Sequence, residues 1–286
     1  MAFKITSLLL LICPFTFAQD KPLLIWVKNN APPFYELYGS EQNQVIGDTV
    51  QAMLQDRLPQ YEHQTRIMPL ARMNSYWEQG EPLCFATMIY RQPQNDTYLL
   101  SAPNIVYFPP GIIFHQDNSE RILAGQSTFD FSSSNRTPPL ILGMIPGRAF
   151  GNKIDNSLTT NAANFVIMDR HGSDETHGML RMLVSKRLDL VIDYEMVLKY
   201  YRTEHEIQQH LRFAPIAGME NDILRGAVGC TNSEWGKHTI AAINIALADL
   251  IQSSEYQQTL SAWFSDLLNT DAYLNVYRQQ ILGQTQ

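Results

Sequence analysis

One glycine-containing turn, in the segment GMIPGRAFG, has the residue types of an anion-binding site. Gly147 and Gly151 let a ligand approach the backbone closely, and the helix expected to begin here presents free N–H groups that attract negative charge. Arg148 adds a cation to the same turn. The spacing is not the GxxxxGK[ST] of a P-loop, which argues against nucleotide hydrolysis. The alternative is an ordinary strand-to-helix turn without a ligand.

A second turn carries aromatic side chains. The apolar run LLIWV, Leu23 to Val27, predicts a buried strand, and Pro32-Pro33 follow it directly. Because proline fixes φ and removes a backbone donor, this turn is stiff and presents Phe34 and Tyr35 in set positions. Stacking on such rings adds about 0.5–1.5 kcal/mol to a contact. We expect at least one of the two to contact a ligand; the alternative is that both are ordinary core residues.

Metal or nucleophile chemistry is not indicated elsewhere. The segment HGSDETH contains His171, Asp174, Glu175 and His177, but histidines six residues apart do not share a helical face. Acidic residues are instead favoured in the first turn of a helix. The sequence contains neither GxSxG nor HExxH. We therefore predict a protein with no metal site, no cofactor and no enzymatic activity.

The N-terminal residues predict export. Lys4 supplies a positive charge, and the following apolar segment ITSLLLLICPFTFA is too short to cross a bilayer. The small residues Thr16 and Ala18 form a cleavage motif, so residues 1–18 are predicted to be a signal peptide removed near Ala18. A lipid-modified Cys13 is the alternative, but Ile12 stands where such sites need a small residue. We expect a periplasmic protein without a membrane-spanning segment.

The net charge and the cysteine content bear on the type of partner and on disulfide bonding. The full chain has a formal net charge of −7, which argues against a nucleic-acid partner because such proteins carry a basic surface. After cleavage two cysteines remain, Cys84 and Cys230. In an oxidising compartment they are candidates for one disulfide, which would join distant parts of the chain. Two buried free thiols are the alternative.

The elements that position these residues alternate between strand and helix, which is typical of a parallel sheet with right-handed crossovers. A proline-punctuated extended stretch and a polar loop separate two such alternations, and a return segment precedes the last helices. The first alternation is expected over 23–27, 48–58, 63–70, 70–80 and 83–90, and the second over 140–147, 148–160, 163–169, 173–187 and 188–194. The return segment covers 211–217 and 225–230, and the last helices cover 234–253 and 255–268.

Several phrases in this order resemble the bacterial periplasmic solute-binding proteins of family 3, whose type members bind amino acids for ABC transporters. They are WVKNNAPPFY, GDTVQAMLQDRL and EQGEPLCFATMIYRQPQNDTYLLSAPN, then GRAFG, MLVSKRLDLVIDY and CTNSEWGKHTIAAINIALADL. The resemblance implies an α/β fold of two lobes (a Venus flytrap) with the second lobe inserted into the first. Lobe 1 would hold residues 19–108 and 219–286, and lobe 2 residues 109–218. The hinge would lie near Val106–Phe114 and Phe213–Val228, with the ligand at the carboxyl ends of the strands.

The resemblance also implies ligand contacts in lobe 1. Arg72, at the start of a helix, would lie near the cleft, where its guanidinium can fork a carboxylate or phosphate; the alternative is a solvated arginine. Amino-acid binders place an arginine for the ligand carboxylate where this sequence has Gln94. Arg91 is a candidate to replace it, and Thr87 and Tyr90 offer further polar groups.

Lobe 2 departs from the family as well. The carboxylate that binds the ligand's amino group would follow Arg187-Leu188-Asp189 by five residues, and that position is Tyr194. Asp193 and Glu195 flank it, but neighbouring strand residues point to opposite faces. We therefore expect Tyr194 to contact the ligand, and we expect that ligand not to be an ordinary α-amino acid.

These features predict a monomeric, non-enzymatic binding protein that captures a small polar or anionic ligand for an ABC transporter. Two alternatives stay open. The same lobes can report a ligand to a membrane signalling receptor, or host lyase or dehydratase chemistry with Asp193 or Glu195 as acid or base.

Overall fold

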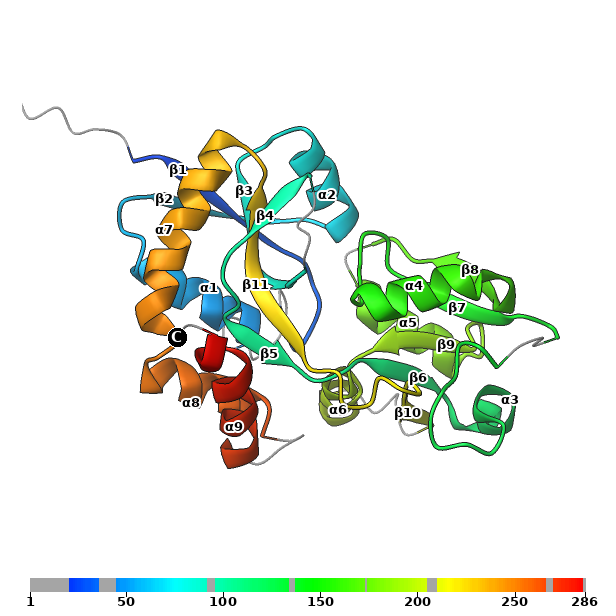
Figure 1. The fold of residues 1–286 in the computed structure, drawn as a ribbon. Helices are drawn as coiled ribbons and strands as arrows, with labels where there is room; N and C mark the ends of the chain where they lie inside the picture. Colours follow the sequence, from blue (N-terminus) through cyan, green and yellow to red (C-terminus); the bar gives the residue numbers. More distant parts are fainter. Residues whose placement is uncertain are drawn as a thin grey trace, which may run out of the picture.

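The computed structural model describes residues 21–35, 45–91, 96–133, 137–172, 174–204, 210–265 and 270–284. The predicted signal peptide with its cleavage site and the position of Gln94 lie outside these ranges. The described chain forms two α/β units, each with its own sheet (Figure 1). The expected two-lobed α/β architecture, with the second unit inserted into the first, is therefore confirmed.

The sheet of lobe 1 has the strand order β2-β1-β3-β11-β4, and β5 also pairs with β11. Strands β1, β2 and β3 are parallel, as the strand–helix alternation predicted, whereas the return strand β11 runs antiparallel to β3. The strands are β1 (Leu23–Lys28), β2 (Glu62–Ile67), β3 (Leu83–Ile89), β4 (Tyr98–Leu100), β5 (Ile105–Tyr107) and β11 (Leu224–Thr231).

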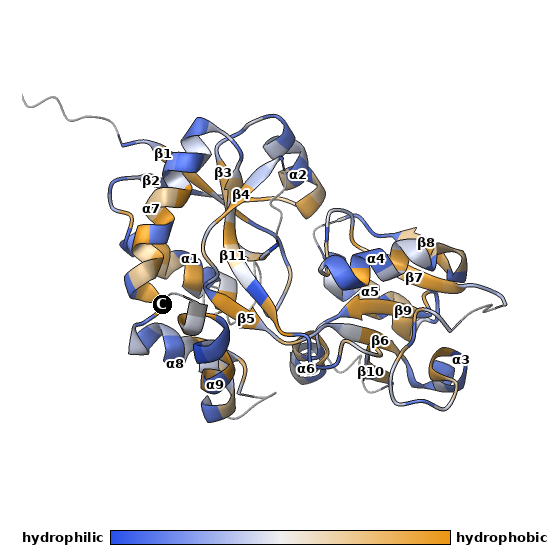
Figure 2. Cartoon of the chain, in the orientation of Figure 1, coloured by the Kyte–Doolittle hydropathy of each residue, from blue (hydrophilic) through white to orange (hydrophobic). Residues whose placement is uncertain are grey.

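Both faces of this sheet are buried at β1, which explains why its residues Leu23 to Val27 are all apolar. Leu24 and Trp26 belong to a core that also contains residues of α1 (Ile46–Asp56) and α7 (Glu234–Leu250). Ile25 and Val27 point the other way, into a core with α2 (Leu70–Glu78). Figure 2 shows the hydrophobic residues concentrated along the strands, while helices such as α4 and α7 carry hydrophilic turns.

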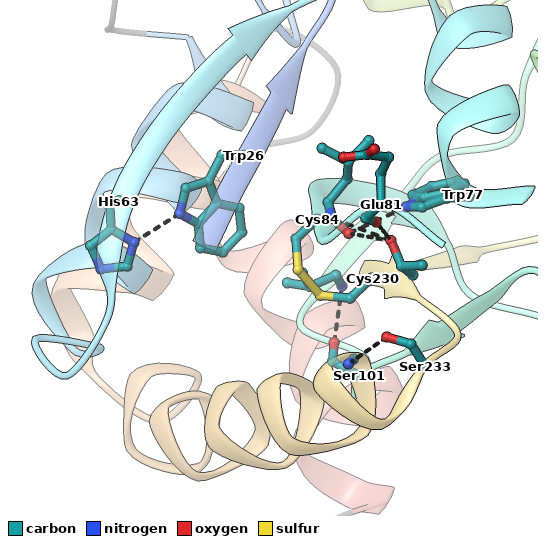
Figure 3. Close-up of a disulfide and its surroundings, with 12 residues drawn as sticks. Trp26, His63, Trp77, Glu81, Cys84, Ser101, Cys230 and Ser233 are labelled. Atoms are coloured by element: carbon teal, nitrogen blue, oxygen red, sulfur yellow. Dashed lines mark hydrogen bonds between the residues drawn. A yellow bond between two sulfur atoms is a disulfide. The ribbon is translucent and has the colours of Figure 1, made fainter. Parts of the chain in front are cut away.

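The predicted disulfide between Cys84 and Cys230 is present (Figure 3). Cys84 on β3 and Cys230 on β11 are direct partners in the antiparallel register, and both are fully buried. The bond closes a loop with a sequence separation of 146 residues that contains all of the second sheet. It therefore joins the two discontinuous parts of lobe 1.

The sheet of lobe 2 has the order β10-β6-β9-β7-β8. Its strands are β6 (Gly111–His115), β7 (Leu140–Met144), β8 (Phe165–Asp169), β9 (Leu190–Asp193) and β10 (Leu211–Pro215). Strands β7, β8 and β9 are parallel, and β6 runs antiparallel to β9. Leu190 and Ile192 pack in one core with α4 (Asn152–Thr160), and Val191 packs in the other with α5 (Glu175–Val184).

Helix boundaries differ from the sequence expectation at several places. The helix expected from residue 148 begins at Asn152, so Arg148 lies in the turn before it. Helices α3 (Ser119–Leu123), α6 (Glu195–Glu204) and α9 (Thr270–Gln280) were not predicted. In α9 the fully buried Tyr273 and Tyr277, one helical turn apart, supplied a readable signal. Helix α8 (Ser254–Trp263) was predicted.

Two chain segments connect the sheets, one from β5 to β6 and one from β10 to β11. They place the carboxyl ends of β1 and β3 opposite those of β7 and β9, where residues of both lobes line one cavity. Among the residues that the structure describes, no helix combines the length and the apolar character needed to cross a bilayer.

Candidate ligand-binding cleft

A cavity of about 380 Å³ lies between the two lobes. Its volume is within the range of roughly 300–1,000 Å³ that is common for small-molecule sites. Six of the eight residues that the sequence singled out as ligand contacts line it: Phe34, Tyr35, Thr87, Arg91, Arg148 and Tyr194. Arg72 and Tyr90 do not.

The proline turn after β1 forms part of the lobe 1 wall. Backbone hydrogen bonds from the N–H groups of Phe34 and Tyr35 to the carbonyl of Ala31 close the turn at 2.9 and 3.1 Å. Gly47, at the start of α1, donates its N–H to the carbonyl of Phe34, and a Cβ at Gly47 would stand 2.5 Å from that oxygen. The turn is thus held against α1 by a contact that only glycine permits.

The two aromatic residues of this turn have different surroundings. Tyr35 is 1% exposed and packs in the lobe 1 core, and its hydroxyl accepts a hydrogen bond from Thr87 at 3.1 Å. Phe34 is only partly buried and extends towards lobe 2. Tyr35 therefore forms the floor of the cavity, while Phe34 forms a side wall.

Three rings join the lobes at the back of the cavity, and we call Phe34, Tyr107 and Tyr194 the aromatic trio. The ring centroid of Phe34 lies 5.8 Å from that of Tyr107 and 5.4 Å from that of Tyr194, both edge to face. Tyr107 and Tyr194 are 6.0 Å apart. Tyr194 stands between the end of β9 and the start of α6, so the trio connects the strand ends of both sheets.

Arg148 is paired within lobe 2. Its two terminal nitrogens donate to both carboxylate oxygens of Asp193 at 2.5 and 2.8 Å, a bidentate fork. The side chain of Asp193 is 5% exposed and also accepts the backbone N–H of Tyr194. The glycine-containing turn therefore aims its arginine at a carboxylate of the protein itself.

Arg91 is paired across the cleft. Its Nη2 donates to Oδ2 of Asp155 on α4 at 3.0 Å, and Oδ1 of Asp155 accepts the backbone N–H of Phe150 at 3.1 Å. A lobe 1 arginine and a lobe 2 backbone donor thus meet at one carboxylate. A second cross-lobe contact is made by Gly147, whose carbonyl accepts from Asn74 of α2 at 3.5 Å.

Within the described part of the chain, two buried polar atoms of residues lining the cavity have no hydrogen-bond partner. They are the hydroxyl of Tyr107 and Oδ1 of Asn29, and these residues are 3% and 6% exposed. Burial raises the pKa of Tyr107 well above its ordinary value, so its hydroxyl keeps its proton and can donate. An unsatisfied buried polar group costs about 1–3 kcal/mol, so a hydrogen-bond partner that reached either atom would stabilise the protein.

The two remaining candidate residues lie elsewhere. Arg72 is exposed on the first turn of α2. The ring of Tyr90 lies under the guanidinium of Arg225 at 5.0 Å and lines a neighbouring cavity beside the hinge segments. Neither side chain reaches the cavity between the lobes.

One perturbed carboxyl lies behind the cavity wall. Glu175, the first residue of α5, is 4% exposed, and burial raises its pKa to about 7 against the opposing effect of Arg148 and Arg170. The adjacent Thr176 lines the cavity, but Glu175 does not. In the described part of the chain no three His, Cys, Asp or Glu side chains gather as a metal site.

Sequence reasoning did not single out four polar residues at or beside the cavity, and only some of them had a signal in the sequence. Asn29 follows β1 directly, which is a position at the carboxyl end of a parallel strand. Tyr107 was placed only in the hinge region. Asn74 and Asp155 act across the cleft, and nothing local in the sequence marks a contact over 64 or 73 residues.

No protein-family model matches the sequence, and no curated protein matches it. Solved structures do. An amino-acid ABC transporter substrate-binding protein from Streptococcus pneumoniae, AbpA bound to L-arginine, matches with a TM-score of 0.62 at 14% identity over 86% of this chain and 95% of that one. The fold is that of the periplasmic binding proteins. A putative L-cystine ABC transporter protein from Listeria monocytogenes matches with a TM-score of 0.62 at 12% identity, covering 88% and 97%.

A histidine kinase sensor domain also shares this fold, with a TM-score of 0.59 at 11% identity over 85% of this chain and 96% of that one. The second Venus flytrap domain of BvgS from Bordetella pertussis matches with a TM-score of 0.60 at 14% identity, over 85% of this chain and 93% of that one. Periplasmic-binding-protein architecture therefore occurs in both transport and signalling proteins. At these identities the likeness concerns the fold alone.

Proposed function

We propose that this protein is an exported solute-binding protein that captures a small molecule between its two lobes and delivers it to an ABC transporter. The observation that carries the proposal is the cavity at the facing carboxyl ends of the parallel strands, which residues of both lobes line. Open parallel sheets bind ligands at this edge. The protein would act as a monomer, with closure bending the chain near the lobe boundaries at 108/109 and 218/219.

The charges of the cavity refine the expected ligand. The sequence predicted a polar or anionic molecule, with Arg91 and Arg148 as its cations. Both guanidinium groups are already paired with aspartates. This arrangement supports a polar ligand and removes the main argument for an anionic one.

Signalling is the second candidate function, because solved sensor domains share the fold over most of their length. An enzymatic role has less support. Asp193 is held in the fork of Arg148, and Glu195 is only partly buried and pairs with Lys199, so neither carboxylate is both free and buried as an acid or base would need. A membrane permease or a membrane receptor is thus the expected partner.

A screen of metabolites by thermal shift on the mature chain, residues 19–286, tests the binding function. A ligand at 100 times its Kd adds about 2.7 kcal/mol to the free energy of unfolding, which is readily detected. If no metabolite shifts the transition, the proposed function is wrong.

A pair of glycine variants tests whether binding needs contact between the lobes. Gly147 has a φ of 85°, and a Cβ there would stand 2.8 Å from Nδ2 of Asn74 and 3.1 Å from the backbone nitrogen of Ala71. Gly125 has a similar φ of 75° and open space around it. Gly147→Ala should weaken binding by about tenfold or more because it disfavours the closed state, whereas Gly125→Ala, equally strained, should not.

A further inference from the structure

The charged groups of the cavity point to a particular class of ligand, and this inference rests on the proposed binding function. Three charged residues line the cavity: Glu78, Arg91 and Arg148. We propose that the cavity takes a neutral, ring-containing molecule with an amide-like hydrogen-bonding group, and that it discriminates against carboxylates and zwitterions.

The first observation is that Arg91, a cation that lines the cavity, is paired with a carboxylate of lobe 2. The two oxygens of Asp155 accept from the guanidinium of Arg91 in lobe 1 and from the N–H of Phe150, two residues before α4, in lobe 2. A ligand carboxylate that bound Arg91 in this way would compete with Asp155. The protein therefore supplies its own carboxylate, and an anionic ligand would first have to displace it.

The second observation is the Arg148–Asp193 fork, which neutralises the other arginine. Both oxygens of Asp193 are engaged, by the guanidinium and by the N–H of Tyr194, so the carboxylate is not free to receive a ligand ammonium group. Burying a charge without a partner is strongly unfavourable. Glu78 does not change this balance, because its side chain is exposed and water solvates its charge.

The third observation is the chemistry of the remaining wall. Phe34 and Tyr194 offer ring edges and faces to the cavity, and Met73, Phe85 and Met88 add apolar surface. Aromatic walls favour a ring, because stacked or edge-to-face contacts add to the area buried. Tyr107 and Asn29 line the cavity, and within the described residues the hydroxyl of the first and Oδ1 of the second are buried without a partner, so a ligand that reached them would find one donor and one acceptor. An amide carries both of these groups and no charge.

Isosteric pairs of probes test the proposal. Benzamide and benzoate differ only in the amide and the carboxylate, and indole-3-acetamide and indole-3-acetate form a larger pair; L-tryptophan supplies the zwitterion. Calorimetry on the mature protein should give at least one amide about tenfold or more tighter than its carboxylate. Equal or tighter binding of a carboxylate or of tryptophan overturns the proposal, and so does the absence of binding by both amides.

A variant then tests whether Asp155 causes the discrimination. Asp155→Asn frees the guanidinium of Arg91 while keeping a similar shape, so carboxylate binding should improve about fivefold or more relative to the amide. Asp117→Asn is the control, because it removes an exposed lobe 2 ion pair with Lys186 that does not line the cavity. If both variants leave the ratio of affinities unchanged, Asp155 is not the discriminating group.

These outcomes separate the two proposals. If metabolites bind but all preferred ones are anions or zwitterions, the ligand class is wrong and the binding function stands. If no metabolite and no probe binds, the function itself fails.

Discussion

The two lobes build their sides of the cleft in different ways. Lobe 1 presents neutral side chains on a stiff proline turn, and a disulfide joins its two discontinuous parts. Lobe 2 presents a turn whose arginine is locked to Asp193 and a helix whose Asp155 reaches across to Arg91. Among the described residues, lobe 1 contributes cavity-lining residues with unpartnered buried polar atoms, whereas the lobe 2 charges at the cavity are paired within the protein. Under the proposed binding function, lobe 1 would supply most of the recognition and lobe 2 would set the charge that the cavity accepts.

The largest expected effect comes from removing the bond that joins the parts of lobe 1. Replacing Cys84 and Cys230 with alanine should lower the free energy of unfolding by about 4–5 kcal/mol, because the bond closes a loop with a sequence separation of 146 residues in the unfolded chain. Denaturant unfolding of the variant and of the oxidised parent measures the loss. A loss below about 1 kcal/mol would show that the disulfide does not anchor this lobe.

The second-largest loss of stability is expected from breaking the Arg148–Asp193 pair of lobe 2. Arg148→Met leaves the buried carboxylate of Asp193 without its partner and should cost about 3 kcal/mol or more. The double variant Arg148→Met/Asp193→Asn removes both charges and keeps an acceptor for the N–H of Tyr194, so it should recover most of that loss. The exposed Arg72→Met serves as control and should change stability by less than about 0.5 kcal/mol. Equal losses in the single and double variants would contradict the account.

The pH dependence of lobe 2 should follow Glu175. Its pKa is about 7 in the folded protein against 4.5 in a free side chain, so the folded state binds the proton more tightly. Stability from this group is therefore fully present below pH 4.5 and is lost as the pH rises through 7. Glu175→Gln should match the parent near pH 4.5 and exceed it by about 2–3 kcal/mol at pH 8. The control Glu195→Gln, at a partly exposed helix start, should show no such difference between the two pH values. The same difference in this control would show that Glu175 is not its cause.

The smallest expected effect on stability comes from removing single tyrosine hydroxyls of lobe 1. One of the two hydroxyls compared has a hydrogen-bond partner and the other has none among the described residues. Tyr277→Phe loses a hydrogen bond to the carbonyl of Ile251 and should cost about 1 kcal/mol without changing ligand affinity. Tyr107→Phe removes a hydroxyl without a partner, so it should leave the stability of the free protein unchanged or slightly higher and should weaken ligand binding. The two results are compared by thermal unfolding with and without ligand. If Tyr107→Phe binds as the parent does, the hydroxyl is not a contact.

Local sequence patterns predicted most of the fold. The apolar runs at β1, β3 and β9 predicted buried parallel strands because both faces of each sheet are covered, and the paired cysteines predicted a bond that the register of β3 and β11 allows. Phe34 was singled out from its position after a strand and Tyr194 from the family resemblance, and both line the cavity. These features depend on neighbours along the chain or on one strand pairing.

The charge of the site was not predictable in the same way. Arg91 and Arg148 were read as free cations because a sequence does not show which carboxylate each guanidinium meets, and their partners are 64 and 45 residues away. Tyr107 was placed only in the hinge region, since nothing local in the sequence indicates that it lines the cavity or that its hydroxyl is buried without a partner among the described residues. Helix α4 also begins four residues later than expected, which moved Arg148 out of the helix start.

The most direct test of the central claim is a crystal structure of the mature protein with the molecule that it binds. The account predicts that this molecule lies between the lobes against Phe34 and Tyr194, with a polar atom within hydrogen-bond distance of the Tyr107 hydroxyl. It also predicts that the Arg91–Asp155 and Arg148–Asp193 pairs stay intact. A ligand carboxylate inserted into either pair, or a ligand bound outside this cavity, would contradict it.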